Sequence, residues 1–143
     1  MRSVITFIII LTAFVGTVNS LEYLLALERC EGAAPGAFTI HGLWPQYNQT
    51  SWPQFCNKSA TFDYQALQPL MGQIDRYWLT CSEFNHTESW FLKHEWLKHG
   101  TCTPFSEVQY FGTGLALYQM LPWAVQCPPD INQCLLEVTG IMT

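Results

Sequence analysis

Six cysteines, spread from Cys30 to Cys134, constrain this chain more than any other feature of its sequence. Six cysteines allow 15 pairings, so the sequence alone does not give the connectivity. None of them forms a CxxC pair beside a matching histidine cluster, which argues against a structural zinc site. Whether they form disulfides depends on the redox compartment in which the chain folds, and the N-terminus indicates that compartment.

The N-terminus has the pattern of a secretory signal peptide. Arg2 precedes an apolar run over residues 4–15, and Val-Asn-Ser at 18–20 is typical of a cleavage site. The run is about 12 residues long, whereas a membrane-spanning helix needs about 20, so a membrane anchor is the weaker interpretation. We therefore expect residues 1–20 to be a signal peptide, residues 21–143 to form one domain, and the cysteines to be oxidised.

Three Asn-X-Ser/Thr sequons agree with a secretory destination. They begin at Asn48, Asn57 and Asn85, and we expect them to be glycosylated in surface loops. No other stretch of the sequence is long and apolar enough to cross a bilayer, so no membrane association is expected after the signal is removed. The expected location is extracellular, or a lysosome or vacuole reached through the secretory pathway.

The composition excludes a disordered chain and a broad basic surface for duplex nucleic acid. Hydrophobic residues make up 49%, aromatic residues 15% and charged residues 12%, which is typical of a globular domain with a sizeable core. Six Lys and Arg stand against eleven Asp and Glu, a net charge of −5. Any chemistry on nucleic acid must therefore come from a local site.

Two β-prone segments lie early in the chain. Residues 23–27 form an apolar stretch that favours a strand, although a helical turn also fits. Residues 38–40 are β-prone and lead directly into His41, which is therefore expected at or near a strand end. The polar stretch 45–59 contains prolines and is expected to be a loop.

Three segments have helical spacing. Residues 88–99 are the clearest, because they contain neither Gly nor Pro and Thr87 is placed to cap their N-terminus. Residues 63–79 and 106–120 are also compatible with helices. From Leu121 onward prolines interrupt the pattern, and no closing element is expected.

The clearest helix carries most of the side chains that are suited to chemistry. At 100° per residue, a polar face about 140° wide holds four of them: His94, Glu95, Lys98 and His99. Such a face could be a solvated stripe, but that is a less natural interpretation in a chain with only 12% charged residues. Trp96 points elsewhere and can anchor the helix in the core.

His94-Glu95 also resembles the start of the zinc motif HExxH. That motif needs its second histidine four residues after the first, where this chain has Lys98, and a cation there would oppose a metal ion. We therefore expect a site without metal. His99 suits a general base, because imidazole titrates at neutral to mildly acidic pH. Glu95, one turn earlier, can orient it.

The remaining parts of an acid–base site can be assigned from the same residues. Lys98 and protonated His94 can hold a phosphate or its developing charge. His41 is the candidate for the second proton carrier, and it lies beside Gly42, which permits close approach. Trp44 can stack on a base. Taken alone, His41 would more simply be a hydrogen-bonded core histidine, and Trp44 a core aromatic.

Two long segments contain rare residues in a fixed order: FTIHGLWP at residues 38–45 and KHEWLKHGTC at residues 93–102. They resemble the two active-site signatures of the ribonuclease T2 family, the secreted acid endoribonucleases. The clear resemblance covers residues 23–118. It implies an α+β fold with a mainly antiparallel central sheet, flanked by helices and stapled by disulfides.

The resemblance also implies a reaction. The family cleaves single-stranded RNA without metal or cofactor, by attack of the 2′-hydroxyl on the adjacent phosphorus. A 2′,3′-cyclic phosphate forms and is later hydrolysed to a 3′-phosphate. His99 would take the 2′-hydroxyl proton, and His41 would protonate the 5′-oxygen leaving group. DNA, which lacks that hydroxyl, is excluded as a substrate.

Substrate contacts follow from the same resemblance. Glu95, His94 and Lys98 would bind the phosphate and stabilise the pentacovalent state. Trp44 would line the site for the base 5′ of the cut. The position two residues on, often acidic in base-specific members, is Gln46 here, so no base preference is predicted. The expected partner is single-stranded RNA, bound by a monomer.

The disulfide pairing implied by the family is Cys30–Cys81 and Cys56–Cys102. Cys127 and Cys134 remain and can pair with each other, although family members usually place C-terminal cysteines farther apart. Two departures from the family pattern concern the scaffold. Glu28-Arg29-Cys30 stands where a Trp-Pro and a further Cys are usual, and 41 residues follow Cys102, where the family has a longer tail.

These departures lead us to expect a C-terminal part that is short or incomplete. The leading expectation is an acid endoribonuclease, and the alternative is a catalytically impaired secreted member that binds RNA or protein. Protonation of the four histidines would move the net charge of residues 21–143 from −6 to about −2, easing the approach of RNA. We expect an optimum at about pH 5.

Overall fold

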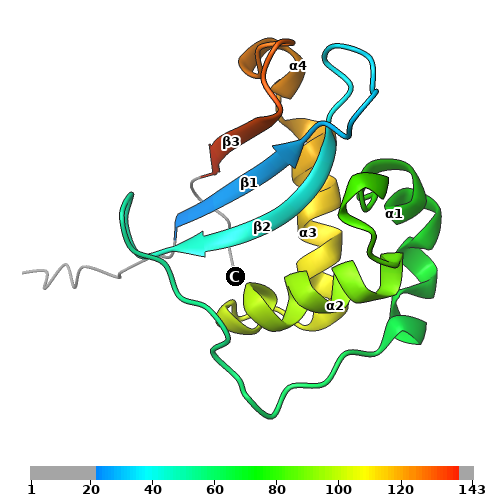
Figure 1. Cartoon of the computed structure of the whole chain (residues 1–143). Helices are drawn as coiled ribbons and strands as arrows, with labels where there is room; N and C mark the ends of the chain where they lie inside the picture. Colours follow the sequence, from blue (N-terminus) through cyan, green and yellow to red (C-terminus); the bar gives the residue numbers. More distant parts are fainter. Residues whose placement is uncertain (1–21, 139–143) are drawn as a thin grey trace, which may run out of the picture.

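The computed structural model describes residues 22–138 of the chain (Figure 1). The expected signal peptide, residues 1–20, lies outside the described residues. Three antiparallel strands form one sheet in the order β2-β1-β3. Figure 1 shows α3 running along one face of this sheet, with α1 and α2 beyond the β2 edge. The predicted α+β fold with a mainly antiparallel sheet is confirmed.

The first two strands are β1 (Glu22–Glu28) and β2 (Thr39–Gln46). The strand expected at residues 23–27 is confirmed. His41 is the third residue of β2, but the strand continues to Gln46, where a loop was expected to begin at Pro45. Pro45 is tolerated because β2 lies at the edge of the sheet that the described residues form, the position to which proline within sheets is largely confined.

The third strand, β3 (Gln133–Val138), corrects the expectation that no closing element follows Leu121. It pairs antiparallel with β1, with Leu136 opposite Leu25. Buried and exposed residues alternate along all of it, which is the pattern of a strand with one face on the core. The segment is short and comes soon after two prolines, so this alternation is easily overlooked.

Seven helical segments complete the described chain: η1 (Tyr64–Leu70), α1 (Met71–Tyr77), η2 (Ser82–Phe84), α2 (Glu88–Lys98), η3 (Gly100–Cys102), α3 (Glu107–Met120) and α4 (Trp123–Gln126). The single helix expected over residues 63–79 is instead a 3₁₀ segment followed by a short α-helix. Pro69 lacks the N–H that a continuous α-helix needs there, which accounts for the change. Among residues 22–138, no helix is long and apolar enough to cross a bilayer.

Local caps define the two long helices. The hydroxyl of Thr87 accepts a hydrogen bond from the N–H of Trp90, as expected for the N-cap of α2. Ser106 and Gln109 form a reciprocal capping box at the start of α3. Gly114 of α3 faces the ring of Trp78, where a Cβ would clash, so α3 can pack closely on this buried indole.

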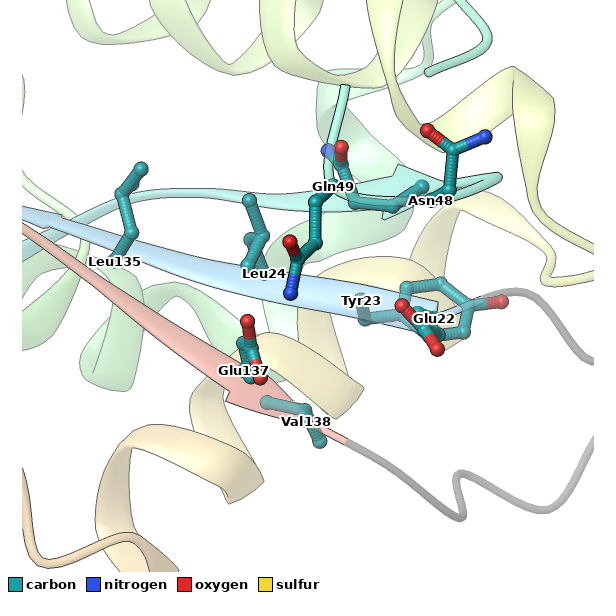
Figure 2. A pocket seen from close by; sticks show the side chains of 9 residues that line it. Glu22, Tyr23, Leu24, Asn48, Gln49, Leu135, Glu137 and Val138 are labelled. Carbon is teal, nitrogen blue, oxygen red and sulfur yellow. The ribbon is translucent and has the colours of Figure 1, made fainter. Parts of the chain in front are cut away.

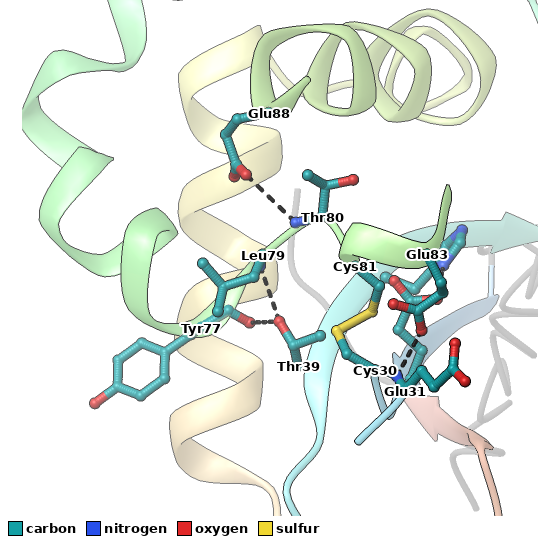
Figure 3. The surroundings of a disulfide bond; sticks show 11 residues. Cys30, Glu31, Thr39, Tyr77, Leu79, Thr80, Cys81, Glu83 and Glu88 are labelled. Carbon is teal, nitrogen blue, oxygen red and sulfur yellow. Dashed lines mark hydrogen bonds and ion pairs between the residues drawn. A yellow bond between two sulfur atoms is a disulfide. The ribbon is translucent and has the colours of Figure 1, made fainter. Parts of the chain in front are cut away.

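Three disulfides join these elements: Cys30–Cys81, Cys56–Cys102 and Cys127–Cys134. The first two match the pairing implied by the family. They close sequence separations of 51 and 46 residues, each worth about 4 kcal/mol in the chain-entropy model. Figure 3 shows hydrogen bonds near the first disulfide: the Thr39 hydroxyl donates to the Tyr77 carbonyl and accepts from the Leu79 N–H.

Candidate active site

One carboxylate, Glu95 of α2, lies at the centre of the predicted site. Its Oε2 accepts a hydrogen bond from the indole N–H of Trp44 at 3.1 Å. Its Oε1 lies 3.5 Å from Nε2 of His41. The ring of Trp44 in turn stacks on that of His99, with centroids 5.2 Å apart and planes at 23°. The structure therefore brings together these four residues from β2, from α2 and from the C-cap position of α2.

Burial excludes the solvated-stripe interpretation of α2. Glu95 is 1% exposed and His99 5% exposed. Burial raises the pKa of Glu95 to about 7, although His41, the Trp44 N–H and Lys98 act against the rise. Gly42 makes room for this carboxylate, because a Cβ there would collide with it. The glycine thus serves the packing of α2 on β2.

His41 is held from two sides by carboxylates. Its Nδ1 lies 2.7 Å from Oε2 of Glu28, the last residue of β1, and its Nε2 faces Glu95. Burial by itself would lower the pKa of His41, but the hydrogen bond to Glu28 and the charge of Glu95 raise it above its ordinary value. His41 is thus favoured as a cation.

His99 has the opposite environment. Burial, followed by the positive charges of Lys98, His94 and His41, lowers its pKa to about 3. Its Nδ1 is buried without a hydrogen-bond partner among residues 22–138. His99 is therefore neutral in mild acid, which is the state that a general base requires.

His94 and Lys98 lie on the same side of α2, half-buried. His94 stacks on Trp90, with centroids 5.3 Å apart and planes at 7°. Burial, then the charge of Lys98, lowers the pKa of His94. Lys98 is therefore the more dependable cation for an anion bound here, and His94 gains its proton more readily once such an anion is present.

A pocket of about 320 Å³ opens beside the stacked rings. Trp44, Gln46, Lys98 and His99 line it together with the indole of Trp52, which is 53% exposed. The flat, apolar indole walls and polar Gln46 and Lys98 suit a nucleobase joined to a phosphate. Trp52 did not emerge from the sequence, because its only signal was an aromatic residue in a polar loop.

A second hollow, of about 500 Å³, adjoins the first where β1 begins and β3 ends (Figure 2). The two share Leu24, Gln46, Gln49 and Leu135. Glu22 and Glu137 give the second hollow an acidic lining, so it suits an RNA phosphate less well than the pocket beside Lys98.

Glu28 is the other residue that sequence reasoning missed as a site residue. Its neighbourhood depends on strand register: it pairs with Thr39, two residues before His41. A carboxylate that ends an apolar strand was the only signal in the sequence. No spacing rule connects it with a histidine 13 positions away.

The three sequon asparagines, Asn48, Asn57 and Asn85, are all exposed outside the long helices and strands. This placement is compatible with glycosylation, which stays a prediction. Among the described residues, potential metal ligands cluster only at Cys30, Cys81 and Glu83. The two sulfurs there are bonded to each other, so they offer no thiolate.

Comparison with known proteins gives one family. A family model described as the Ribonuclease T2 family matches residues 6–135. The chain is 41% identical to Ribonuclease 3 of Arabidopsis thaliana over 90 residues, which cover 62% of this chain and 40% of that protein. It is 35% identical to human Ribonuclease T2 over 109 residues, 73% of this chain and 38% of that protein.

The solved structures that resemble this chain are ribonucleases as well. Human RNase T2 superposes with a TM-score of 0.60 at 29% identity, over 75% of this chain and 60% of that one. RNase NT in complex with 5′-AMP superposes with a TM-score of 0.56 at 30% identity, over 69% of this chain and 55% of that one. The chain spans about 40% of the length of the two curated relatives.

Proposed function

The chain belongs to the ribonuclease T2 family, and we propose that it is a secreted endoribonuclease that cleaves single-stranded RNA without a metal cofactor. The observation that carries the proposal is the pair of histidines that contact Trp44 from opposite environments. One is favoured as a cation and the other as a neutral base, which is the division of roles that general acid–base catalysis needs.

The first step uses His99. Because its Nδ1 is buried, Nε2 is left to take the proton of the substrate's 2′-hydroxyl. The 2′-oxygen then attacks the neighbouring phosphorus, and the bond from phosphorus to the 5′-oxygen breaks. Nε2 of His41 gives its proton to that leaving oxygen. The products are a 2′,3′-cyclic phosphate and a free 5′-hydroxyl.

The phosphate needs cations and hydrogen-bond donors. Lys98 supplies a positive charge, and His94 adds one when an anion favours its protonation. With a pKa of about 7, Glu95 is mainly protonated in mild acid and can donate a hydrogen bond to a phosphoryl oxygen instead of repelling it. In the second stage water replaces the leaving group, His41 acts as base and His99 as acid, and a 3′-phosphate results.

The base 5′ of the cut would occupy the pocket of Trp44 and Trp52, with Gln46 at its polar edge. His99 already covers one face of Trp44, so the base would use the remaining indole surface. We propose, further, that residues 1–20 direct secretion and that the chain acts in an acidic compartment or outside the cell.

Mild acid suits both histidines. His99 is neutral above about pH 3, and His41 is charged below a pKa that lies above its ordinary value. Activity should therefore peak in the acid range, at about pH 5, and fall as the pH rises through the pKa of His41. A measured optimum above about pH 8 would count against the two-histidine mechanism.

The direct test uses the full chain, expressed through a eukaryotic secretory pathway and purified with its disulfides intact. It is incubated with single-stranded RNA in EDTA at about pH 5, beside the His99→Ala variant. We expect cleavage that leaves 2′,3′-cyclic ends and is lost in the variant. A folded wild-type chain that binds RNA and does not cleave it would instead support the binding function.

A further inference from the structure

We propose that Glu28 is a positioning residue for the proton donor: it accepts a hydrogen bond from Nδ1–H of His41 and so leaves Nε2–H directed at the substrate. The proposal rests on the ribonuclease function proposed above and adds a third residue to the His41–Glu95 pair. Its geometric basis is the 2.7 Å distance between Oε2 of Glu28 and Nδ1 of His41.

The backbone around Glu28 holds it firmly. It ends the central strand of the sheet and pairs with Thr39 on one side and Gln133 on the other. The next two residues are tied down as well, because the N–H of Arg29 donates to the Asn132 carbonyl and Cys30 forms a disulfide. A carboxylate on such a frame keeps its direction when the ring of His41 gains or loses a proton.

Glu28 has no competing partner among the described residues. It is 7% exposed, and its second oxygen, Oε1, is buried without a hydrogen bond. The adjacent guanidinium of Arg29 bonds to the Pro129 carbonyl and the Asn132 side chain instead. A buried carboxylate whose single hydrogen bond is to a histidine is costly for stability alone, which favours a functional explanation.

The other charged groups around His41 come from α2. Glu95 faces its Nε2, and the positive charge of Lys98 opposes its protonation, as does His94 whenever His94 is charged, while neutral His99 adds no charge. Trp44 and Phe91 contact the ring edge-on, with centroids 5.5 and 5.3 Å away, and neither contributes a charge.

Glu95 is a poor substitute for Glu28 in mild acid. With a pKa of about 7 it is mainly protonated there and contributes little negative charge. It also faces the nitrogen that must release the proton. When Nε2 of His41 passes its proton to the 5′-oxygen, the imidazole becomes neutral and keeps Nδ1–H bonded to Glu28. The tautomer is thereby preserved for the next turnover.

The test compares Glu28→Gln and Glu28→Ala in the full secreted chain, with Glu31→Gln as matched control. Glu31 is exposed and three residues further on, so its loss removes the same charge from the neighbouring loop. Two readouts are used: the titration of His41 by NMR, and the pH profiles of kcat and KM on a dinucleotide substrate.

For Glu28→Gln we expect His41 to titrate at lower pH and the alkaline limb of the kcat profile to move down with it. For Glu28→Ala, which also removes the acceptor, kcat should fall about 10–100-fold with KM nearly unchanged, as is typical when a residue that orients a catalytic group is lost. Glu31→Gln should match the wild type in both readouts.

An unchanged His41 titration in Glu28→Gln would overturn the proposal even if RNA is cleaved normally. A raised KM with unchanged kcat would also overturn it, because Glu28 would then be a substrate contact. If the wild type cleaves no RNA, the proposed function fails separately, and the NMR titration still decides whether Glu28 controls His41. Glu28→Gln is nearly isosteric, so it answers the question even if Glu28→Ala does not fold.

Discussion

Two histidines contact the same indole ring, that of Trp44, and their surroundings differ in almost every respect. His41 comes from the sheet, contacts the carboxylates of Glu28 and Glu95, and has a raised pKa. His99 comes from the end of α2, is buried under Trp44 beside Lys98, and has a pKa lowered to about 3. The comparison shows that the environment assigns acid and base roles to identical side chains.

The difference has a simple architectural origin. In the antiparallel register Glu28 of β1 is paired with Thr39 of β2. His41 is two residues after Thr39 on the same strand, so the Glu28 carboxylate can reach it. Helical periodicity instead places His94 and Lys98 on the side of α2 that also carries His99. The sheet thus supplies negative charge to one histidine, and the helix supplies positive charge to the other.

The largest effect is expected from removing either histidine. His41→Ala and His99→Ala should each lower kcat by about 10²–10⁴-fold, the usual contribution of a general acid or base. The two variants should separate on a nucleoside 3′-aryl phosphate, whose phenolate leaving group needs no proton. His41→Ala should recover most of its activity on this substrate, and His99→Ala should not.

Steady-state rates on RNA and on the aryl ester measure this difference, with circular dichroism as the check on folding. Equal recovery in both variants would mean that the acid and base roles are not divided as the two environments indicate.

Lys98→Gln tests the cationic side of the comparison. We expect kcat/KM to fall by about 10²-fold, because a positive charge on the phosphate is lost. The pKa of His99 should rise at the same time, since Lys98 is one of the charges that lower it. The acid limb of the pH–rate profile would then move to higher pH.

Lys93→Gln is the matched control for Lys98→Gln. Lys93 lies on the same helix but is exposed, and it lines neither pocket beside the site. If both variants lose the same activity, net charge and not the position of Lys98 is responsible.

Trp44→Phe addresses the link between the two histidines. The variant keeps an aromatic ring beside His99 and removes the N–H that donates to Glu95. That hydrogen bond lowers the pKa of Glu95, so its pKa should rise in the variant. We expect kcat to fall about 10-fold, because the Glu95 carboxyl loses one of the hydrogen bonds that hold it in place. Carbonyl-region infrared titration follows Glu95, and an unshifted titration would show that the indole N–H is unimportant. Trp96→Phe is the control, because it removes from α2 an indole N–H that donates to the Thr61 carbonyl outside the site.

The smallest effect concerns stability. Because the pKa of Glu95 is higher in the folded chain than the ordinary value of 4.5 that it has in the unfolded chain, burial of neutral Glu95 contributes to the free energy of unfolding. That contribution is fully present below pH 4.5 and is lost as the pH rises through about 7. The pKa of His99 is lower in the folded chain than its ordinary value of 6.5. Its contribution to the free energy of unfolding is therefore fully present above pH 6.5 and is lost as the pH falls toward 3. Glu95→Gln should therefore reduce the fall of Tm as the pH rises toward 7. His99→Asn should reduce the fall of Tm as the pH drops toward 3. Calorimetric scans across the pH range check both, and identical profiles in the two variants would contradict the opposite shifts.

Much of this site could be predicted from local sequence. The Thr87 cap, the absence of Gly and Pro, and the 3.6-residue period were enough to place Glu95 and His99 on one side of a helix. The strand leading to His41 followed from β-prone residues. Its extension to Gln46 did not, because whether Pro45 is tolerated depends on β2 being an edge strand.

Other parts depended on contacts between distant segments. β3 is short, and its alternation becomes meaningful only when β1 is there to pair with it. Glu28 and Trp52 lie in segments with no catalytic pattern of their own. They join the site through strand register in one case and through the path of the loop after β2 in the other.

The sequence by itself determined which chemical groups are available and which of them share a helix, because capping and periodicity are properties of neighbouring residues. Only the tertiary structure decided the charge that each group carries. Protonation depends on burial and on the sign of nearby charges, and His41, Glu95 and His99 acquire both from segments far away in the chain.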